Sequence, residues 1–551
     1  MYLCSFDGIM AEKRVVKITN KKTGTVYLYE DRPYWDKEKK RPTHERKCIG
    51  KVGSDGSVEY NAYYRDRERI QALERKAGAQ AAVSKTTLMG QRMILDKEAR
   101  EIKIEKVLSK AFGADDAARI MALAYYMVCK GKALSRSEQW LEDRGYADLG
   151  LTSQRISELL ARIGRDAVNT FLKGWLEANS TSDTLLFDIT SVSTYGKNNP
   201  YSEYGYNRDR ENLEQINLAL LTSCKSGLPL WVKELEGSMS DVAVVNDVID
   251  ELRRLGISSF TFCGDRGFYS AGNLKNLEDN GIKFLVPVPS GVKWGKEMIA
   301  EHRASLVSPM NVIYDGEGVT LYGKTVYRTT PEYGRTWYHI YYDPARKDKA
   351  VAAFMIKLRK CYDELVAGSP IEAHKSLYEQ YFIVKDTPKR GRKVIQNDAA
   401  VREYLENDSC YWILIGTTKL TAPQALRDYR DRGEVELGFD DLKNLLDLNR
   451  LRSHSSATIL GKIFINFVAL ILLSSLKRTV SAIPEKDRHY WSASDMLDKV
   501  ETYSKVHFVG KYKDRFTTAT LKQRQIFDLL GIKYVYKGEE VNAEPQAPND
   551  L

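Results

Sequence analysis

Residues 260–267 read Phe-Thr-Phe-Cys-Gly-Asp-Arg-Gly, an apolar run that stops at a glycine and an aspartate. Aromatic and β-branched residues favour a strand, and glycine and aspartate favour the turn that ends it. An amphipathic pattern over residues 241–255 predicts a helix before this strand, and a second helix leads to another apolar run at residues 283–286. Because strands joined through a helix usually run parallel, the two runs are expected to share one sheet.

Three more apolar runs precede this unit, at residues 184–187, 216–221 and 228–232. A turn at residues 225–227 separates the last two runs, which predicts an antiparallel meander. A meander, a crossover helix and a parallel strand follow one another in the ribonuclease H fold. We therefore expect an α/β fold class with a ribonuclease H-like catalytic core.

The composition is that of a globular protein with several domains. The chain has 551 residues, of which 43% are hydrophobic and 29% charged, so a small disulfide scaffold, a collagen and a disordered chain are excluded. Seven cysteines are scattered without a CxxC pair, which suits a reducing cytoplasm. His44 and Cys48 lack a second pair at zinc-finger spacing, so no zinc site is expected.

The formal net charge is +10, and most of the excess lies near the N-terminus. Residues 1–100 hold 22 Lys and Arg against 14 Asp and Glu. A basic segment ahead of a near-neutral body often marks a nucleic-acid contact. A solvated basic surface is the alternative, and the charge alone does not separate the two.

The pattern along the chain predicts six parts. They are a β-rich basic N-terminal module (1–62), a helical region (63–178), the first part of an α/β core (179–290), a β-rich insertion (291–408) with a basic loop at 389–393, the second part of the core (409–480), and a C-terminal helical region (481–551) whose tail from about residue 537 is expected to be disordered. Short helices within residues 135–163 fit a helix-turn-helix or an ordinary bundle, and both remain open.

The longest apolar run covers residues 459–476 and is interrupted by Lys462 and Asn466. It is too short and too polar to span a bilayer, so it predicts a buried helix rather than a membrane span. The N-terminus does not resemble a signal peptide, because no basic segment precedes an apolar stretch.

Two aspartates, Asp188 and Asp265, each follow an apolar strand. Ligands usually bind at the strand ends of open α/β sheets. One such aspartate usually caps a turn, but two on neighbouring strands repel each other and are best retained when a cation lies between them. The pair therefore indicates a candidate metal site.

A third element is the helix that opens at Thr421, where Thr421 and Gln424 predict a capping box. At about 100° per residue, Tyr429, Arg432, Glu436 and Lys443 share an arc of about 60° that borders an apolar stripe. The stripe consists of Val435, Phe439, Leu442 and Leu446.

Two other acidic residues lie on this helix. Glu434 points away from the polar arc, whereas Asp440 lies close enough to it to be a second candidate ligand. Gly433 and Gly438 are costly inside a helix, and close approach of another backbone is one explanation for them. A solvated helix carrying Arg432/Glu436 pairs is the alternative.

The spacing Tyr429-x2-Arg432-x3-Glu436-x6-Lys443 resembles the Y-(2)-R-(3)-E-(6)-K signature of bacterial insertion-sequence transposases of the "insertion sequence four" type, in the DDE superfamily. The sequence Asp-Arg-Gly-Phe at 265–268 resembles their second motif, and Asp-Ile-Thr-Ser at 188–191 resembles the first. The resemblance covers roughly residues 180–480, and the insertion is similar to the β-rich insert of family members.

The resemblance implies a DNA transposase that cleaves element ends and transfers the strands into target DNA. It also implies DNA binding or dimerisation for the helical region (63–178) and catalysis for the core. Asp188, Asp265 and Glu436 would hold two Mg²⁺ ions, for which Mn²⁺ can substitute, and no covalent enzyme intermediate forms. Tyr429, Arg432 and Lys443 would grip phosphates near the cleaved end. The expected partners are double-stranded DNA, both terminal inverted repeats and target, and a second copy in a homodimer on DNA. The expected location is the bacterial cytoplasm, in association with the nucleoid.

Trp337 in the insertion is a candidate to stack on a displaced base, with core packing as the alternative. Three other functions compete with transposition. A ribonuclease H-like nuclease without strand transfer needs the same three carboxylates. A domesticated DNA-binding regulator would be expected to have lost one of them, and a two-carboxylate glycosidase would not need the Tyr-Arg-Lys strip.

Overall fold

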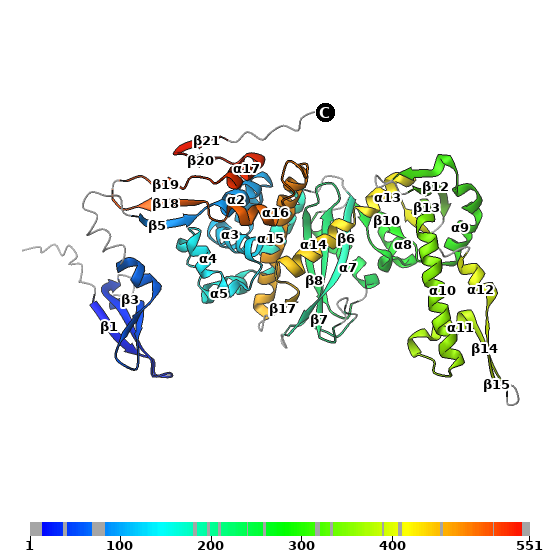
Figure 1. Ribbon diagram of the computed structural model, residues 1–551, viewed down its shortest axis with the longest axis horizontal. Helices are drawn as coiled ribbons and strands as arrows, with labels where there is room; N and C mark the ends of the chain where they lie inside the picture. Colours follow the sequence, from blue (N-terminus) through cyan, green and yellow to red (C-terminus); the bar gives the residue numbers. More distant parts are fainter. Residues whose placement is uncertain are drawn as a thin grey trace, which may run out of the picture. The chain divides into compact units, whose positions relative to one another are not determined.

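The computed structural model describes residues 14–36, 41–68, 83–179, 184–195, 199–205, 207, 211–239, 241–256, 260–314, 320–330, 334–387, 391–405, 410–451, 456–510 and 512–542. The chain divides into two compact units, whose helices and strands are labelled in Figure 1. The first unit comprises residues 1–90, 502–524 and 533–542. The second unit comprises residues 91–501, 525–532 and 543–551.

The first unit is built of small antiparallel sheets. One has the order β1-β2-β3-β4, formed by β1 (Arg14–Thr19), β2 (Val26–Asp36), β3 (Arg41–Val52) and β4 (Val58–Tyr60). Another has the order β19-β18-β5, formed by β5 (Val83–Leu88), β18 (Ser504–Phe508) and β19 (Arg515–Phe516). A hairpin joins β20 (Tyr534–Tyr536) and β21 (Glu539–Val541). The strands expected at the start of the chain are thus confirmed.

Two expectations about these segments are wrong. The region 63–178 is not helical throughout, because β5 pairs with β18. The partner lies far along the chain, so local periodicity does not reveal it. Residues 537–541 are not a disordered tail either, because Glu539–Val541 pairs with β20, and β18 to β21 make the C-terminal region mixed rather than helical. Residues 543–551 lie outside the described residues.

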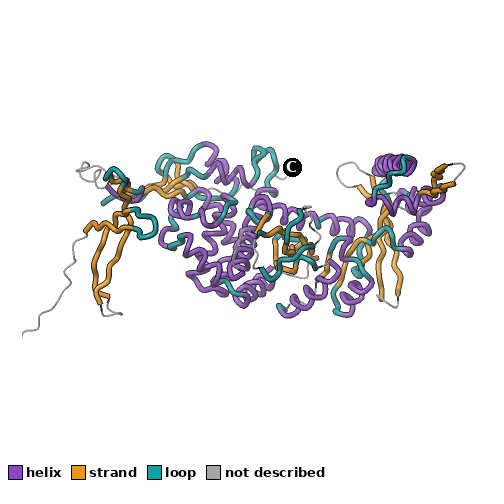
Figure 2. The backbone as a smooth tube through the Cα atoms, turned by 90° about the horizontal axis from the view of Figure 1, so that it is seen from below, coloured by secondary structure: helices purple, strands orange, loops and turns teal. Residues whose placement is uncertain are grey.

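A helical layer forms one part of the second unit, together with the short connections around it (Figure 2). Its helices are α2 (Gly90–Glu101), α3 (Ile104–Lys130), α4 (Glu138–Asp143), α5 (Ser153–Arg162), α6 (Arg165–Asn179), α15 (Ser456–Ser481) and α16 (Ala493–Val500), and α17 (Leu521–Leu529) follows near the C-terminus. Helix α15 packs against α3 and α5. It is long and apolar enough to cross a membrane, but most of its apolar stretch is buried inside the protein. The buried helix predicted at residues 459–476 is confirmed.

Helix α5 is the longer of the two helices considered for a helix-turn-helix. It buries Ile156, Leu159 and Leu160, and most of its other side chains are exposed. Bundle packing therefore occupies its apolar face, while DNA binding by the exposed face stays a prediction.

The other part of the second unit is a mixed sheet with the strand order β11-β12-β13-β16-β10-β9-β6-β7-β8. Its first five strands along the chain are β6 (Thr184–Thr194), β7 (Gln215–Ser223), β8 (Pro229–Glu236), β9 (Thr261–Cys263) and β10 (Lys283–Pro287). Strands β6, β7 and β8 form the predicted meander, and β9 runs parallel to both β6 and β10. The connecting helices are α7 (Asp241–Arg254) and α8 (Ala271–Asp279). The short β17 (Arg450–Leu451) also pairs with β6.

The insertion is only partly β-rich, and its first three strands do not form a sheet of their own. Strands β11 (Val312–Tyr314), β12 (Thr320–Thr330) and β13 (Gly334–Tyr342) continue the core sheet, because β13 pairs with β16 (Tyr411–Gly416) and β16 pairs with β10. Helix α9 (Lys293–Leu306) packs on β13 and β16. A chain segment that looked like an inserted subdomain therefore shares the hydrogen-bonded framework of the core.

Residues 344–405 form what we call the insertion lobe. It consists of α10 (Pro344–Val366), α11 (Lys375–Tyr381), α12 (Asp398–Glu403) and the two-stranded ribbon of β14 (Phe382–Thr387) and β15 (Gly391–Gln396). Its own apolar core includes Phe354, Leu358, Tyr381 and Phe382. Of the expected basic loop, residues 391–393 belong to β15, and 389–390 lie outside the described residues.

Glycines show where backbones approach closely. The proposed explanation for Gly433 and Gly438 is wrong, because a Cβ at Gly433 would meet nothing within 4 Å and one at Gly438 would meet only leucine side chains, at 3.4 Å and 3.9 Å. The glycine that another backbone approaches closely is Gly461 in α15. A Cβ there would lie 2.3 Å from the carbonyl oxygen of Leu160 in α5.

We expect Gly461→Ala to lower the thermal midpoint of unfolding, with a loss of about 2 kcal/mol or more from overpacking. Helix propensity alone predicts the opposite, a gain of about 1 kcal/mol. Gly433→Ala is the matched control and should leave the midpoint unchanged or slightly raised. Thermal unfolding followed by circular dichroism distinguishes the two, and an equal midpoint for both variants would contradict the close contact between α5 and α15.

Candidate active site

The two aspartates lie at the same level of adjacent parallel strands. Strands β6 and β9 pair Leu186 with Cys263, and each aspartate follows its strand partner by two residues. Side chains of β6 alternate across the sheet, so Asp188 is placed on the face opposite Phe187. The predicted proximity of the two aspartates is therefore present in the sheet register. The prediction that Asp188 follows its strand is wrong, because β6 continues to Thr194 through further buried residues, and only Asp265 comes after the end of its strand.

Three aromatic rings pack together next to the two aspartates in the sequence. Phe187 lies 5.3 Å from Phe262 and 5.0 Å from Phe268, measured between ring centroids. Phe268 ends the short 3₁₀ turn that Asp265 caps by accepting a hydrogen bond from the Gly267 N–H at 2.6 Å. The packing of the rings thus fixes the backbone that carries both carboxylates.

Asp188 is almost fully buried and bonded on both oxygens. Oδ1 accepts the Ile189 N–H at 2.8 Å, and Oδ2 lies 3.5 Å from Nη1 of Arg432. The Arg432 side chain is 15% exposed and that of Asp188 is 7% exposed. The opposite charges of a buried ion pair attract each other more strongly than those of a surface pair, because water screens them less.

The helix that carries Arg432 is less regular than the sequence predicts. It consists of α13 (Ala422–Arg430) and α14 (Gly433–Asp440), followed by a π-helical turn over Asp441–Leu445. The capping box of Thr421 and Gln424 is confirmed. The uniform helix through Lys443 is wrong, because hydrogen bonding changes at residues 431–432 and again in the π-helical turn, where the Leu446 N–H bonds to the Asp441 carbonyl.

The expected polar arc is nevertheless kept over its first three members. Nη2 of Arg432 donates to Oε1 of Glu436 at 2.5 Å, and its guanidinium lies 5.7 Å from the ring centroid of Tyr429. The apolar stripe of Val435, Phe439, Leu442 and Leu446 is buried, as predicted. The remaining candidates, Lys443, Glu434 and Asp440, lie elsewhere on the surface of this core.

Lys443 is half-buried in the π-helical turn. The pKa of Glu211 is lowered mainly by hydrogen bonds from Ser193 and Arg450, and the charge of Lys443 adds a smaller effect. Glu434 lines a separate cavity of about 400 Å³ with Asp431 and Lys477, consistent with its predicted orientation away from the arc. Asp440 is exposed and accepts a hydrogen bond from Asn444.

Arg432 interacts electrostatically with all three candidate ligands. Burial acts to lower the pKa of its guanidinium, but Tyr429 and the carboxylates of Asp188, Glu436 and Asp265 outweigh that effect, so its pKa is raised. The guanidinium is a permanent cation that lies among three carboxylates from three different elements. The site therefore concentrates negative charge that needs a positive partner.

Neighbouring groups remain neutral. Burial raises the pKa of the Cys263 thiol to about 12, so no thiolate adds a further negative charge beside Asp265. Burial also raises the pKa of the Tyr429 phenol, although Arg432 opposes the shift. Tyr429 is therefore a hydrogen-bond donor at neutral pH.

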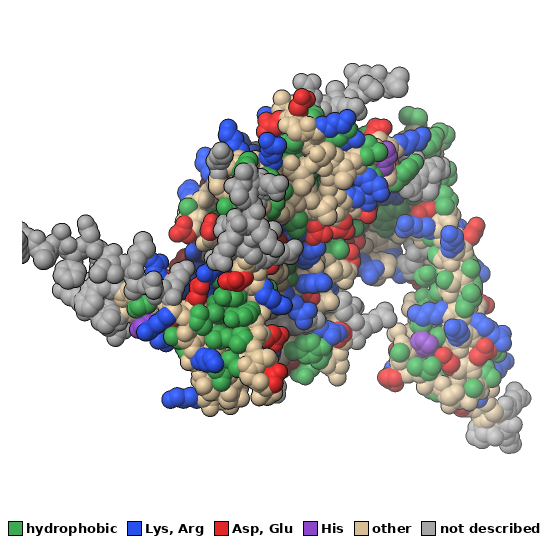
Figure 3. Space-filling model, turned by 60° about the vertical axis from the view of Figure 1, so that its left-hand side comes forward, with side chains coloured by type: hydrophobic (Ala, Val, Ile, Leu, Met, Phe, Trp, Pro, Cys, Tyr) green, Lys and Arg blue, Asp and Glu red, His purple; other side chains and the backbone are tan. Residues whose placement is uncertain are grey.

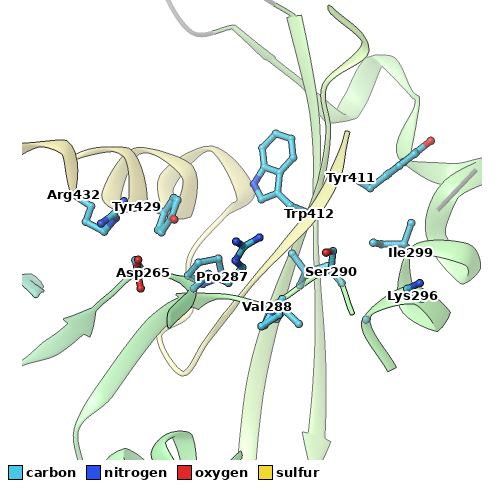
Figure 4. A pocket seen from close by; sticks show the side chains of 14 residues that line it. Asp265, Pro287, Val288, Ser290, Lys296, Ile299, Tyr411, Trp412, Tyr429 and Arg432 are labelled. Atoms are coloured by element: carbon cyan, nitrogen blue, oxygen red, sulfur yellow. The ribbon is translucent and has the colours of Figure 1, made fainter. Parts of the chain in front are cut away.

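A cavity of about 520 Å³ opens beside Asp265 (Figure 4). Asp265, Tyr429 and Arg432 lie on one side of it, and Trp412 from β16 reaches toward the same hollow. Arg266 and Lys296 also line it and make its walls basic.

Sequence reasoning did not single out Arg266, Lys296 or Trp412. Trp337, the tryptophan that the sequence suggested, is half-buried on β13 opposite Gly416 and does not line this cavity. The pairing of β16 with β10 brings Trp412 near Asp265, and no local pattern contains that information.

Residues 179–472, more than half of the chain, match the family model described as "Transposase DDE domain". The chain belongs to this family. It is therefore a DNA transposase, and the matched range contains Asp188, Asp265 and the helix of Glu436. No curated protein matches the sequence significantly.

Among solved structures, the transposase resembles the piggyBac transposase in a synaptic complex with hairpin DNA. The similarity covers 70% of each chain, with 11% sequence identity and a TM-score of 0.37. A similarity of this size adds nothing to the geometry of the transposase site described above.

We expect Arg432→Met to destabilise the transposase in EDTA by about 2 kcal/mol, because the buried carboxylate of Asp188 loses its cationic partner. Added Mg²⁺ should raise the thermal midpoint of the variant more than that of the wild type, since a cation can take the place of the guanidinium. Arg427→Met, at an exposed position of α13, is the control. Equal midpoints in EDTA for Arg432→Met and the wild type would show that the cluster does not depend on Arg432.

Proposed function

We propose that this transposase cleaves DNA at the ends of a mobile element and joins the freed strands to target DNA. In this proposal Asp188, Asp265 and Glu436 are the catalytic carboxylates, and the protein is of the insertion sequence four type with a ribonuclease H-like core. The observation that carries the proposal is the guanidinium of Arg432, which lies among these three carboxylates and binds two of them directly.

The donor set fits divalent cations. Carboxylate oxygens are the ligands that Mg²⁺ and Mn²⁺ prefer, and the three side chains belong to β6, to the turn after β9 and to α14. Bound there, two Mg²⁺ ions would supply Lewis-acid charge at the attacking and leaving oxygens of a phosphodiester. With the carboxylates paired to cations, Arg432 would be available to bind phosphate.

The side chains of the chain itself position the DNA. Arg432 can donate two parallel hydrogen bonds to a phosphate, and Tyr429 can donate one from its neutral hydroxyl. Arg266 and Lys296 place positive charge along the cavity beside Asp265, where the backbone on one side of the cut would lie. The water or 3′-hydroxyl then attacks phosphorus, and the 3′ oxygen on the other side leaves.

Further parts of the proposal rest on the resemblance. Lys443 serves as a phosphate contact after α14. The proposal that Trp337 stacks on a displaced base rests instead on its aromatic side chain in the insertion, with core packing as the alternative. The protein acts on double-stranded DNA as a homodimer, because two element ends must be held together. A nuclease that cuts without strand transfer uses the same carboxylates, and its product would lack joined strands. A domesticated regulator would bind DNA without cutting it.

We expect Glu436→Gln to reduce Mg²⁺-dependent nicking of a duplex that carries the inverted repeat by several orders of magnitude. The change keeps the shape of the side chain but removes a ligand charge, so DNA binding should persist or tighten. Glu434→Gln, facing the other cavity, is the matched control and should nick normally. An active Glu436→Gln together with an inactive Asp440→Asn would move the third ligand one helical turn along the chain.

The N-terminal sheet is proposed to supply selection of the element ends. Deletion of residues 1–175 would also remove α3 and α5, which pack against α15, so a shorter deletion gives the cleaner test. A variant lacking residues 1–68 should lose its preference for the inverted repeat over random DNA, with a shallower salt dependence. Gel-shift titration at several salt concentrations measures both. Unchanged preference would assign end recognition to residues 83–179 or to the core.

A further inference from the structure

The insertion lobe carries a surplus of positive charge far from the candidate carboxylates in the sequence. Residues 344–405 hold 13 Lys and Arg against 8 Asp and Glu, a surplus of five in a chain whose net charge is +10. Lys and Arg side chains are spread over the visible face of the lobe in Figure 3. An electrostatic surplus of this kind favours a polyanionic partner.

The β14–β15 ribbon extends from the lobe (Figure 1). Its base is fixed, because Phe382 belongs to the apolar core of the lobe and Val394 packs against that core. Alternation therefore turns the face with Val384 and Asp386 toward the lobe side, where Asp386 pairs with Arg392 at 3.8 Å. The opposite face is left to solvent, and an isolated two-stranded ribbon is only marginally stable.

The outer face carries an unfavourable pair. Lys385 and Lys393 are direct cross-strand partners, and both are exposed. Like charges directly opposite each other destabilise a ribbon. Within the described part of the chain, neither lysine has a carboxylate at ion-pair distance. Packing thus gives no reason for two lysines at these positions, whereas a bound anion would relieve their repulsion.

Apolar side chains accompany the lysines on this face. Ile383 pairs with Ile395, and Ile383 is 48% exposed. A face with paired cations and adjacent apolar groups fits a duplex groove, where phosphates flank base edges and thymine methyl groups. The major groove is about 12 Å wide and admits a two-stranded ribbon.

We propose that the β14–β15 ribbon binds a groove of double-stranded DNA, with Lys385 and Lys393 on phosphates and the isoleucine pair toward the groove. The proposal rests on the proposed function, because it assumes that the transposase acts on DNA. It adds a contact surface in the insertion lobe that is separate from the Tyr429 and Arg432 site.

The test compares the full-length wild type with Lys385→Thr/Lys393→Thr on a random-sequence duplex of about 30 base pairs, over a range of salt concentrations. Loss of two phosphate contacts should make the slope of log affinity against log salt shallower by about 1.8 and weaken binding most at low salt. The thermal midpoint should be unchanged or higher, since threonine suits a strand and the charge repulsion is removed.

Two controls sharpen the test. Lys357→Ala/Lys360→Ala removes the same charge from exposed positions of α10 and should keep the wild-type slope. Lys385→Arg/Lys393→Arg retains the charge and should also keep it. The proposal is overturned if the threonine variant keeps the wild-type slope, if the α10 variant loses as much, or if polyglutamate competes as well as duplex DNA. It is also overturned if the threonine variant has a lower midpoint and the arginine variant does not restore the slope.

The failure of this proposal can be told apart from the failure of the proposed function. If the wild type neither binds duplex DNA in a salt-dependent way nor nicks it with Mg²⁺, the proposed function fails. If the wild type does both and the ribbon variants bind like it, only the ribbon proposal fails.

Discussion

Repulsion between carboxylates is the constraint around which the core is arranged. Asp188 lies within β6, and Asp265 follows the adjacent parallel strand β9 at the same level, so their charges are brought toward one another by the same hydrogen bonds that build the sheet. The arrangement is tolerable because the guanidinium of Arg432 lies among them and also holds Glu436. A folded chain that keeps such a cluster is prepared to exchange one cation for another.

The surrounding structure holds that cluster rigid. The rings of Phe187, Phe262 and Phe268 pack beneath the strand ends. Helix α14 is fixed by its buried stripe, and the buried α15 packs against the π-helical turn that follows α14. Because a site of this kind depends on sub-ångström positioning, the large apolar core serves the chemistry as well as stability.

The insertion extends the same framework. Strand β16 joins β10 to β13, so the cavity beside Asp265 has one wall from the core and another from the strand that returns after the insertion. The insertion lobe has its own apolar core and a basic ribbon, which we propose as a second DNA contact. The chain thus combines a fixed chemical centre with appended surfaces that are free to vary.

Local patterns in the sequence determined much of this. Apolar runs predicted strands β6 to β10, including the antiparallel meander of β6 to β8 and the parallel pair of β9 and β10. Burial in a sheet requires apolar side chains at neighbouring positions, so a local pattern reveals it. The spacing of Arg432 and Glu436 predicted their contact, because one helical turn separates them. The continuous apolar run of α15 predicted a buried helix.

Only the tertiary structure decided the rest. The pairing of β5 with β18, the continuation of the sheet through β16, and the position of Trp412 beside Asp265 depend on residues far apart along the chain. The change to π-helical bonding before Lys443 and the close approach of Gly461 to Leu160 are likewise set by packing between elements. Periodicity reports which face of an element is buried, but the partner that buries it is chosen by the free energy of the whole fold.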